Sequence, residues 1–305
     1  MRTMTKIMLA LLLTALACPA QAALALFACE PEWGALAIEL GGADVSVFVA
    51  TTAKQDPHQI QARPSLIARL RGADLLFCTG AALEIGWLPV LLRQAANSRV
   101  QPGALGYLEA AGQVRLLEVP TRLDRSGGDV HAAGNPHIQT SPDNIRVVAV
   151  ALAARLKQLD PSHAQGYTQR EQAFLQRWDA AMPRWAAKAA PLKGVNVIAY
   201  HKGWAYLEAW LGLNEVGTIE PKPGVPPGSA YLAELLESIP RRQARLVLFA
   251  AYQDPKPALF VAEKAGIGSA MLPFTVGGTD GAGDLFALFD DTLDRLLAAL
   301  EGRRG

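Results

Sequence analysis

This 305-residue chain has almost no excess of charge of either sign. The 29 Lys and Arg residues nearly balance the 28 Asp and Glu residues, which leaves a formal net charge of +1. A nucleic-acid-binding surface needs a basic excess to neutralise phosphates, so nucleic acid is not expected as a partner. Half of the residues are apolar and only 19% are charged, which excludes a disordered chain. A chain of this length is too long to form one small hydrophobic core, so it predicts two domains.

Long hydrophobic runs are also lacking, apart from a short one near the N-terminus. Arg2 and Lys6 precede the apolar residues 7–17, a run shorter than the roughly 20 residues of a membrane-spanning helix. The tripeptide Ala20-Gln21-Ala22 then forms an A-x-A cleavage motif. These features are typical of a secretory signal peptide, predicted here over residues 1–22, rather than of a buried N-terminal helix. The mature chain is expected to be soluble and to work outside the cytoplasm.

Cysteine is scarce, with three residues in the chain. Removal of the signal peptide takes away Cys18 and leaves Cys29 and Cys78, each at the end of a short apolar run. The two sulfur atoms come within bonding range if those runs are adjacent parallel strands. An oxidising compartment favours a disulfide between them, and two buried free thiols are the alternative.

Short apolar runs alternate with helical patterns in two separate blocks of the chain. Such alternation is typical of βαβ units, so it predicts an α/β fold with two parallel sheets, one in each block. The expected strands are 24–28, 45–50, 75–79, 195–199 and 246–250.

A long helical stretch separates the two blocks. Residues 161–188 are rich in Gln, Arg, Glu and Ala and predict one helix of unusual length. We interpret it as a rigid connector between an N-terminal lobe, 23–160, and a C-terminal lobe, 189–305. An ordinary surface helix of one larger domain is the alternative. Ligands of open α/β sheets bind beyond the carboxyl ends of strands, often between domains, so polar residues that follow strands are the candidates for a site.

Histidine is scarce as well, with five residues, and three of them lie at the ends of predicted strands or helices. His58 and His137 each follow a proline, and His201 comes directly after a predicted strand. Functional side chains concentrate in such loops, and proline restricts the backbone that carries them. Neutral imidazoles suit Zn²⁺, which usually has four ligands. The three histidines therefore predict a zinc site that needs one more ligand.

The Gly-rich segment 275–284 offers two carboxylates for the fourth position. Asp284 begins a predicted helix and is better explained as its N-cap, so Asp280 is the expected ligand. His131 lies in another Gly-rich loop and is interpreted as solvated, with an accessory or alternative ligand as the other hypothesis. His163, at the start of the connector helix, is expected to be exposed.

The mature chain resembles the cluster A-I substrate-binding proteins of zinc and manganese ABC transporters over essentially its whole length. The motifs around the three histidines carry this resemblance. The stretch ending Asp-Pro-His58 resembles the first-ligand region of that family, and Asn-Pro-His137 resembles its second-ligand motif. Tyr-His201, with the downstream Ile-Glu-Pro-Lys-Pro-Gly224, resembles the third. The resemblance is closest to members whose site has three histidines and one aspartate.

The resemblance implies a fold and a function. The fold is two Rossmann-like lobes joined by one long helix, with the metal in the cleft between them. The function is high-affinity capture of Zn²⁺ in the periplasm and its delivery to an ABC transporter permease. The protein is then not an enzyme but a monomeric binding protein, with the membrane permease as partner and a periplasmic zinc metallochaperone as a second candidate partner.

Two departures from the family pattern bear on the site. Zinc members often carry a His-rich acidic loop before the second-ligand motif. In this chain, residues 123–131 contain a single histidine, His131. The family's aspartate commonly follows the last strand directly, where this chain has Thr275-Val276-Gly277.

His201 stands where manganese members usually have glutamate. Because Mn²⁺ prefers more oxygen ligands, three histidines favour Zn²⁺.

Two other functions are compatible with three histidines. A zinc hydrolase keeps three protein ligands and an open water position, but the chain has no HExxH motif and no evident general base beside a ligand. A metal-binding adhesin or metallochaperone of the same fold is not separated from a transport protein by sequence.

Overall fold

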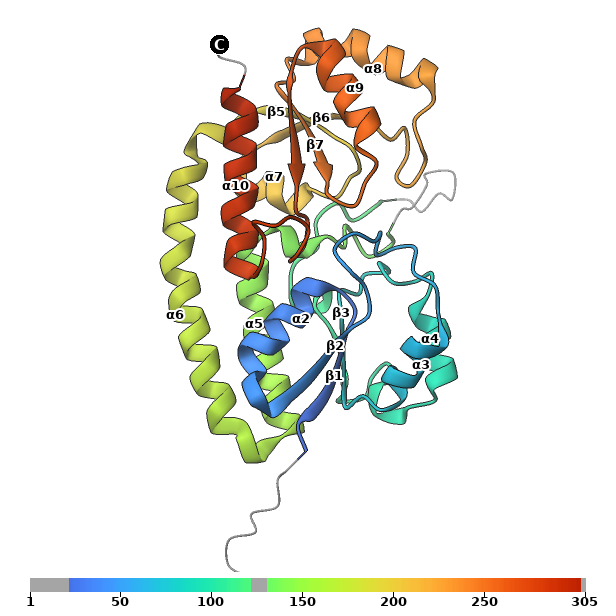
Figure 1. Ribbon diagram of the computed structural model, residues 1–305, viewed down its shortest axis with the longest axis vertical. Coiled ribbons are helices and arrows are strands. Elements are labelled where there is room, and N and C mark those ends of the chain that lie inside the picture. Colours follow the sequence, from blue (N-terminus) through green and yellow to red (C-terminus); the bar gives the residue numbers. More distant parts are fainter. Residues whose placement is uncertain (1–21, 122–130, 303–305) are drawn as a thin grey trace, which may run out of the picture.

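The computed structural model describes residues 22–121 and 131–302 and contains two parallel four-stranded sheets (Figure 1). The strand orders are β2-β1-β3-β4 and β6-β5-β7-β8, so one topology occurs twice and the predicted α/β fold is confirmed. The strands are β1 (Leu24–Ala28), β2 (Val45–Val49), β3 (Leu75–Cys78), β4 (Tyr107–Glu109), β5 (Asn196–Ala199), β6 (Asn214–Thr218), β7 (Leu246–Ala250) and β8 (Gly268–Leu272). The predicted signal peptide lies outside the described residues, except for Ala22.

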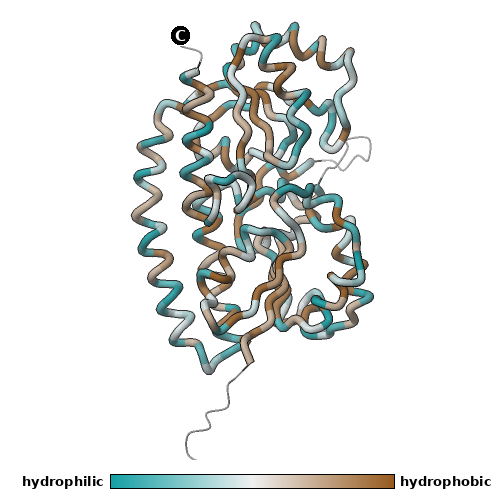
Figure 2. Tube along the Cα trace, viewed as in Figure 1, coloured by the Kyte–Doolittle hydropathy of each residue, from teal (hydrophilic) through white to brown (hydrophobic). Residues whose placement is uncertain are grey.

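Helices cover both faces of each sheet. Because side chains alternate along each strand, each face carries side chains that the helices bury. In β1, Leu26 and Ala28 point into a large core, whereas Phe27 points to the opposite face. The central strands β3 and β7 are therefore buried along their whole length, and Figure 2 shows hydrophobic residues concentrated in the strands. The helices are α2 (Pro31–Gly41), α3 (Pro64–Arg71), α4 (Leu88–Ala95), α5 (Pro142–Leu159), α6 (Ala164–Ala189), α7 (Ala205–Leu211), α8 (Ser229–Arg242), α9 (Pro255–Ala265) and α10 (Leu285–Glu301).

The predicted long connector is α6, which follows a single 3₁₀ turn and joins the two sheets (Figure 1). Its buried Trp178 donates a hydrogen bond to the carbonyl of Pro142 in α5 at 3.0 Å and packs 4.9 Å from the ring of Phe286 in α10. Trp185 donates to Asp290 of α10 at 2.8 Å. Helix α10 also contacts β8 and α2, so it bridges the two halves alongside α6. The residue boundaries predicted for the lobes stay a prediction.

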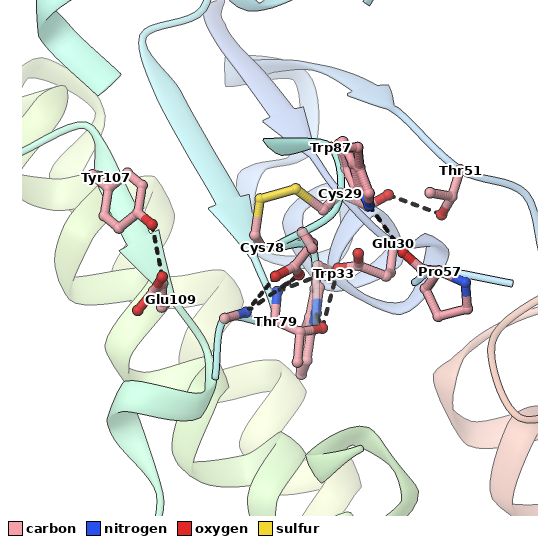
Figure 3. Close-up of a disulfide and its surroundings, with 12 residues drawn as sticks. Cys29, Glu30, Trp33, Thr51, Pro57, Cys78, Thr79, Trp87, Tyr107 and Glu109 are labelled. Carbon is pink, nitrogen blue, oxygen red and sulfur yellow. Dashed lines mark hydrogen bonds between the residues drawn. A yellow bond between two sulfur atoms is a disulfide. The ribbon is translucent and has the colours of Figure 1, made fainter. Parts of the chain in front are cut away.

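A disulfide joins the first two central strands at their carboxyl ends, as predicted (Figure 3). Cys29 directly follows β1 and Cys78 ends the adjacent β3, which brings their Cα atoms to 4.7 Å. Next to the bond, the hydroxyl of Thr79 donates to Glu30 and accepts from the indole N–H of Trp33 at 2.7 Å. The bond therefore ties the carboxyl end of β1 to that of β3.

None of the helices in the described ranges is long and apolar enough to cross a membrane.

Candidate metal centre

Three histidines from distant parts of the chain meet between the two sheets. His58 lies in the loop after β2, His137 precedes α5, and His201 follows β5. One ring nitrogen from each lies within 4.8 Å of the others, and the ring centroids are 5.3 to 5.6 Å apart. The structure thus brings together the three histidines that the sequence singles out. Their role as metal ligands stays a prediction.

Two of the three imidazoles are held by carboxylates on their Nδ1 atoms. Asp56 accepts from His58 at 2.7 Å, and Glu220 accepts from His201 at 2.7 Å. Each bond fixes the Nδ1–H tautomer and leaves the Nε2 lone pair available to an ion, the usual arrangement around metal-binding histidines. Burial alone would raise the pKa of Asp56, but the hydrogen bond from His58 holds it below its ordinary value.

The third imidazole, His137, is only 1% exposed. In the described part of the chain neither of its ring nitrogens has a hydrogen-bond partner. Burial, reinforced by the neighbouring imidazoles, lowers the pKa of His137 well below its ordinary value, so this ring is neutral at physiological pH. A buried nitrogen without a partner is costly unless a ligand satisfies it.

Asn135 holds the loop that carries His137 in place and ties it to the other half of the molecule. Its side-chain oxygen accepts from the backbone N–H of His137 at 3.0 Å, and its amide donates to the carbonyl of Lys202 at 2.8 Å. The hydroxyl of Tyr206 in α7 donates to the carbonyl of Asn135 at 2.7 Å. The loop is therefore positioned jointly by the two halves of the chain.

The expected carboxylate ligand is not brought to the histidines. Asp280 is exposed and is absent from the group of converging ligand atoms. Its neighbour Thr279 donates to Asp291 of α10 at 2.6 Å, which holds this part of the loop against α10. Asp284 caps α10, as predicted, because its Oδ1 accepts from the backbone N–H groups of Phe286 and Ala287 at 2.8 Å.

His131 departs from the expected solvated loop position. It is half-buried, and its Nε2 lies 3.3 Å from Nε2 of His58, with 6.3 Å between the ring centroids of His131 and His137. The sequence interpretation was wrong here, because spacing along the chain does not reveal that the loop before His137 folds back over His58. His163 is 35% exposed at its side chain and bonds to Asp160, away from this cluster.

Cavities open on two sides of the cluster and are lined from both halves of the chain. One, of about 300 Å³, is bordered by His131, His137 and Lys202. Another, of about 190 Å³, is bordered by Asp56 and Glu220. Sequence reasoning did not assign Glu220 to the site, although it lies in the proline-rich motif downstream of the third histidine. Its position two residues after the end of β6 is the signal that could have identified it.

The chain matches the family model described as "Zinc-uptake complex component A periplasmic" over residues 27–299. It is 24% identical over 226 residues to a high-affinity zinc uptake system protein ZnuA of Yersinia pestis, covering 69% of each chain. It is 28% identical over 120 residues to a protein of that name from Brucella abortus, covering 39% of this chain and 36% of the relative.

Solved structures share the fold along nearly the whole chain. A crystal structure of ZnuA aligns with a TM-score of 0.76 at 22% identity, over 91% of this chain and 99% of that one. The Pseudomonas aeruginosa binding protein FpvC, in complex with Mn²⁺, aligns with a TM-score of 0.77 at 19% identity, over 92% and 99%. A mutant laminin-binding adhesin of Streptococcus agalactiae aligns with a TM-score of 0.75 at 21% identity, over 91% and 99%.

Proposed function

The chain belongs to the periplasmic zinc-uptake component A family, and on that premise we propose that it captures Zn²⁺ and delivers it to an ABC transporter permease. The observation that carries the proposal is the convergence of His58, His137 and His201, with ring nitrogens within 4.8 Å of one another. The family is one of binding proteins, so the ion is cargo and the protein is not an enzyme.

The donor set supports Zn²⁺ over Mn²⁺. Three imidazole nitrogens converge, and no carboxylate oxygen joins them in the group of ligand atoms found among the described residues. Zn²⁺ accepts nitrogen ligands in a tetrahedron, whereas Mn²⁺ prefers carboxylate, carbonyl and water oxygens. The likeness to the Mn²⁺-bound FpvC is one of fold, so the choice of metal rests on the histidines.

Delivery requires the site to load and then to open. Ligands come from both halves, so separation of the halves removes His201 from His58 and His137. The long α6 and the bridging α10 limit that separation to a hinge-like motion.

The proposal also includes secretion directed by the N-terminal signal peptide. It takes the protein to be a monomer, with a metallochaperone as a second partner.

Two alternative functions make different demands. A hydrolase needs an open coordination position and turnover of an ester or peptide, and membership of a binding-protein family argues against it. A metal-binding adhesin is the other alternative, and a laminin-binding adhesin shares the fold. Growth under zinc starvation separates transport from adhesion. A deletion strain that grew normally there would argue against the transport function.

The direct test is a titration of metal-free protein with Zn²⁺ and with Mn²⁺ by calorimetry. We expect one tight Zn²⁺ site, much weaker Mn²⁺ binding, and a large loss of Zn²⁺ affinity in His58→Ala, His137→Ala and His201→Ala. His163→Ala is the matched control, because that histidine lies outside the cluster. A wild-type protein that bound no Zn²⁺, or three variants that bound it as tightly as His163→Ala, would refute the proposal.

A further inference from the structure

The three histidines leave one position of a tetrahedral zinc site to be filled, and the end of β8 does not fill it. Phe274, two residues beyond β8, packs its ring 5.2 Å from the ring of His137. Phe274 is buried, and its phenyl ring offers no ligand atom. An apolar side chain, and not a carboxylate, thus packs on His137 where the chain leaves β8.

The loop after Phe274 also keeps its carboxylate away. Gly278 lies so close to the end of β8 that an added Cβ would stand 1.9 Å from the carbonyl oxygen of Pro273. The carbonyl of Gly278 accepts from Lys54 at 2.5 Å, and Thr279 is bonded to α10. Because the backbone on the N-terminal side of Asp280 is fixed in this way, its exposed carboxylate cannot reach the histidines without remodelling the loop.

His131 lies beside the histidine cluster, with its Nε2 in contact with Nε2 of His58. A zinc tetrahedron with Zn–N bonds of about 2.0–2.1 Å has edges of about 3.3–3.4 Å. The Nε2 atoms of His131 and His58 are 3.3 Å apart, the length of one such edge. The ring of His131 is 5.3 Å from that of His58 and 6.3 Å from that of His137. His131 lies outside the group of ligand atoms within 4.8 Å of one another, so it must move toward His137 and His201 to join them around an ion.

A short turn fixes the backbone of His131 relative to the other ligands. The N–H of Gly134 donates to the carbonyl of His131 at 3.1 Å, and the next N–H, that of Asn135, donates to Leu117 at 2.8 Å. Gly134 has a φ of +122°, and an added Cβ would lie 2.8 Å from the carbonyl oxygen of Leu117, so only glycine fits. His131 is therefore held six residues before His137 by a defined turn.

The charges of the site are consistent with a fourth neutral ligand. Four imidazoles leave the double positive charge of Zn²⁺ uncompensated among the ligands themselves. Asp56 and Glu220, each bonded to an Nδ1 atom, supply two negative charges one bond further out. A ligand carboxylate is then not needed for electroneutrality, which matters in a site where burial penalises net charge.

We propose that His131 is the fourth ligand, so that this protein binds Zn²⁺ in a four-imidazole site with no oxygen ligand. The inference rests on the proposed function and deepens it, because four nitrogen donors discriminate more strongly against Mn²⁺ than three nitrogens and one oxygen. In the metal-free state Nε2–H of His131 donates to Nε2 of His58. On metal binding that proton moves to Nδ1 of His131 by exchange with solvent, and the ring stays neutral.

The test compares His131→Ala with Asp280→Ala, using Zn²⁺ affinity and the visible spectrum of the Co²⁺-loaded protein. His131→Ala should lose Zn²⁺ affinity by at least about 10–100-fold, the loss typical even for removal of a residue that only supports a ligand. Its Co²⁺ bands should weaken as water enters the open position, and added imidazole should restore them. Asp280→Ala and the control His163→Ala should match wild type in both measurements.

Either of two results would overturn the assignment. One is a His131→Ala protein with wild-type affinity and spectrum, and the other is an Asp280→Ala protein that shows the changes expected of His131→Ala. Both are distinguishable from failure of the proposed function, which appears as absent Zn²⁺ binding in the wild-type protein. Thermal unfolding of each metal-free variant separates loss of a ligand from loss of the fold.

Discussion

One oxygen of Glu220 accepts a hydrogen bond from Nδ1 of His201 at 2.7 Å and a second from the backbone N–H of Gly224 at 2.9 Å. A single carboxylate thus orients the third histidine and at the same time anchors the proline-rich loop that follows β6. This pairing explains in physical terms why the proline-rich motif accompanies the histidine: the motif delivers the acceptor that sets the histidine's tautomer.

Glu220→Gln should weaken Zn²⁺ binding while the fold persists. The amide keeps the shape but is a poorer acceptor than a carboxylate, so the His201 ring loses orientation and basicity. We expect a loss of about 10–100-fold in Zn²⁺ affinity by competition with a chromophoric chelator. Asp56→Asn should act similarly through His58. An unchanged affinity in both variants would show that the two carboxylates do not position the ligands.

The interface between the halves contains a buried carboxyl group that should make stability depend on pH. Glu32 accepts from the hydroxyl of Thr275 at 2.5 Å, and burial raises its pKa from 4.5 to about 7 although that bond opposes the shift. The folded state therefore holds an extra proton between about pH 4.5 and 7. The stability from the neutral group is fully present below about pH 4.5 and is lost as pH rises through 7.

Glu32→Gln should remove the part of this pH dependence that comes from Glu32. The neutral amide carries no charge to desolvate, so the variant should gain stability relative to wild type above pH 7, by at most about 3 kcal/mol. Urea unfolding from pH 5 to pH 8.5 measures the difference, and Glu39→Gln on the same helix controls for the loss of one carboxylate. If the wild-type and Glu32→Gln curves ran parallel over this range, the raised pKa would be refuted.

The disulfide should stabilise the first half of the protein chiefly by restricting the unfolded chain. Cys29 and Cys78 are separated by 49 residues, and closing a loop of that length is worth about 4 kcal/mol in the chain-entropy model. The double variant Cys29→Ala, Cys78→Ala should lose stability of that order in urea unfolding. Its Zn²⁺ affinity at temperatures where it stays folded should be close to that of wild type.

Trp178 should be a major source of stability for the connector. It is fully buried in α6, bonds to the carbonyl of Pro142 and packs on Phe286. Trp178→Ala should cost about 3–5 kcal/mol, whereas Trp178→Phe keeps an aromatic ring and should cost much less. Equal losses in the two variants would show that the indole hydrogen bond, and not the ring packing, dominates.

The local pattern of the sequence was sufficient for the parts of this protein that depend on neighbouring residues. Alternating apolar runs predicted the α/β fold, because strand and helix periods are local properties of the chain. The long helix and the cap at Asp284 followed for the same reason. The histidines were identified by their places after strands or before a helix, and the disulfide by two strand ends that the expected topology makes adjacent.

Only the tertiary structure decided which polar groups share the space between the halves. Asp280 and His131 both lie in Gly-rich loops, and the sequence favoured the carboxylate. The folded chain places Phe274 against His137 and turns the following loop toward α10, while the turn at Gly134 carries His131 to His58. Loop paths are set by long-range contacts such as these, and residue spacing along the chain carries no record of them.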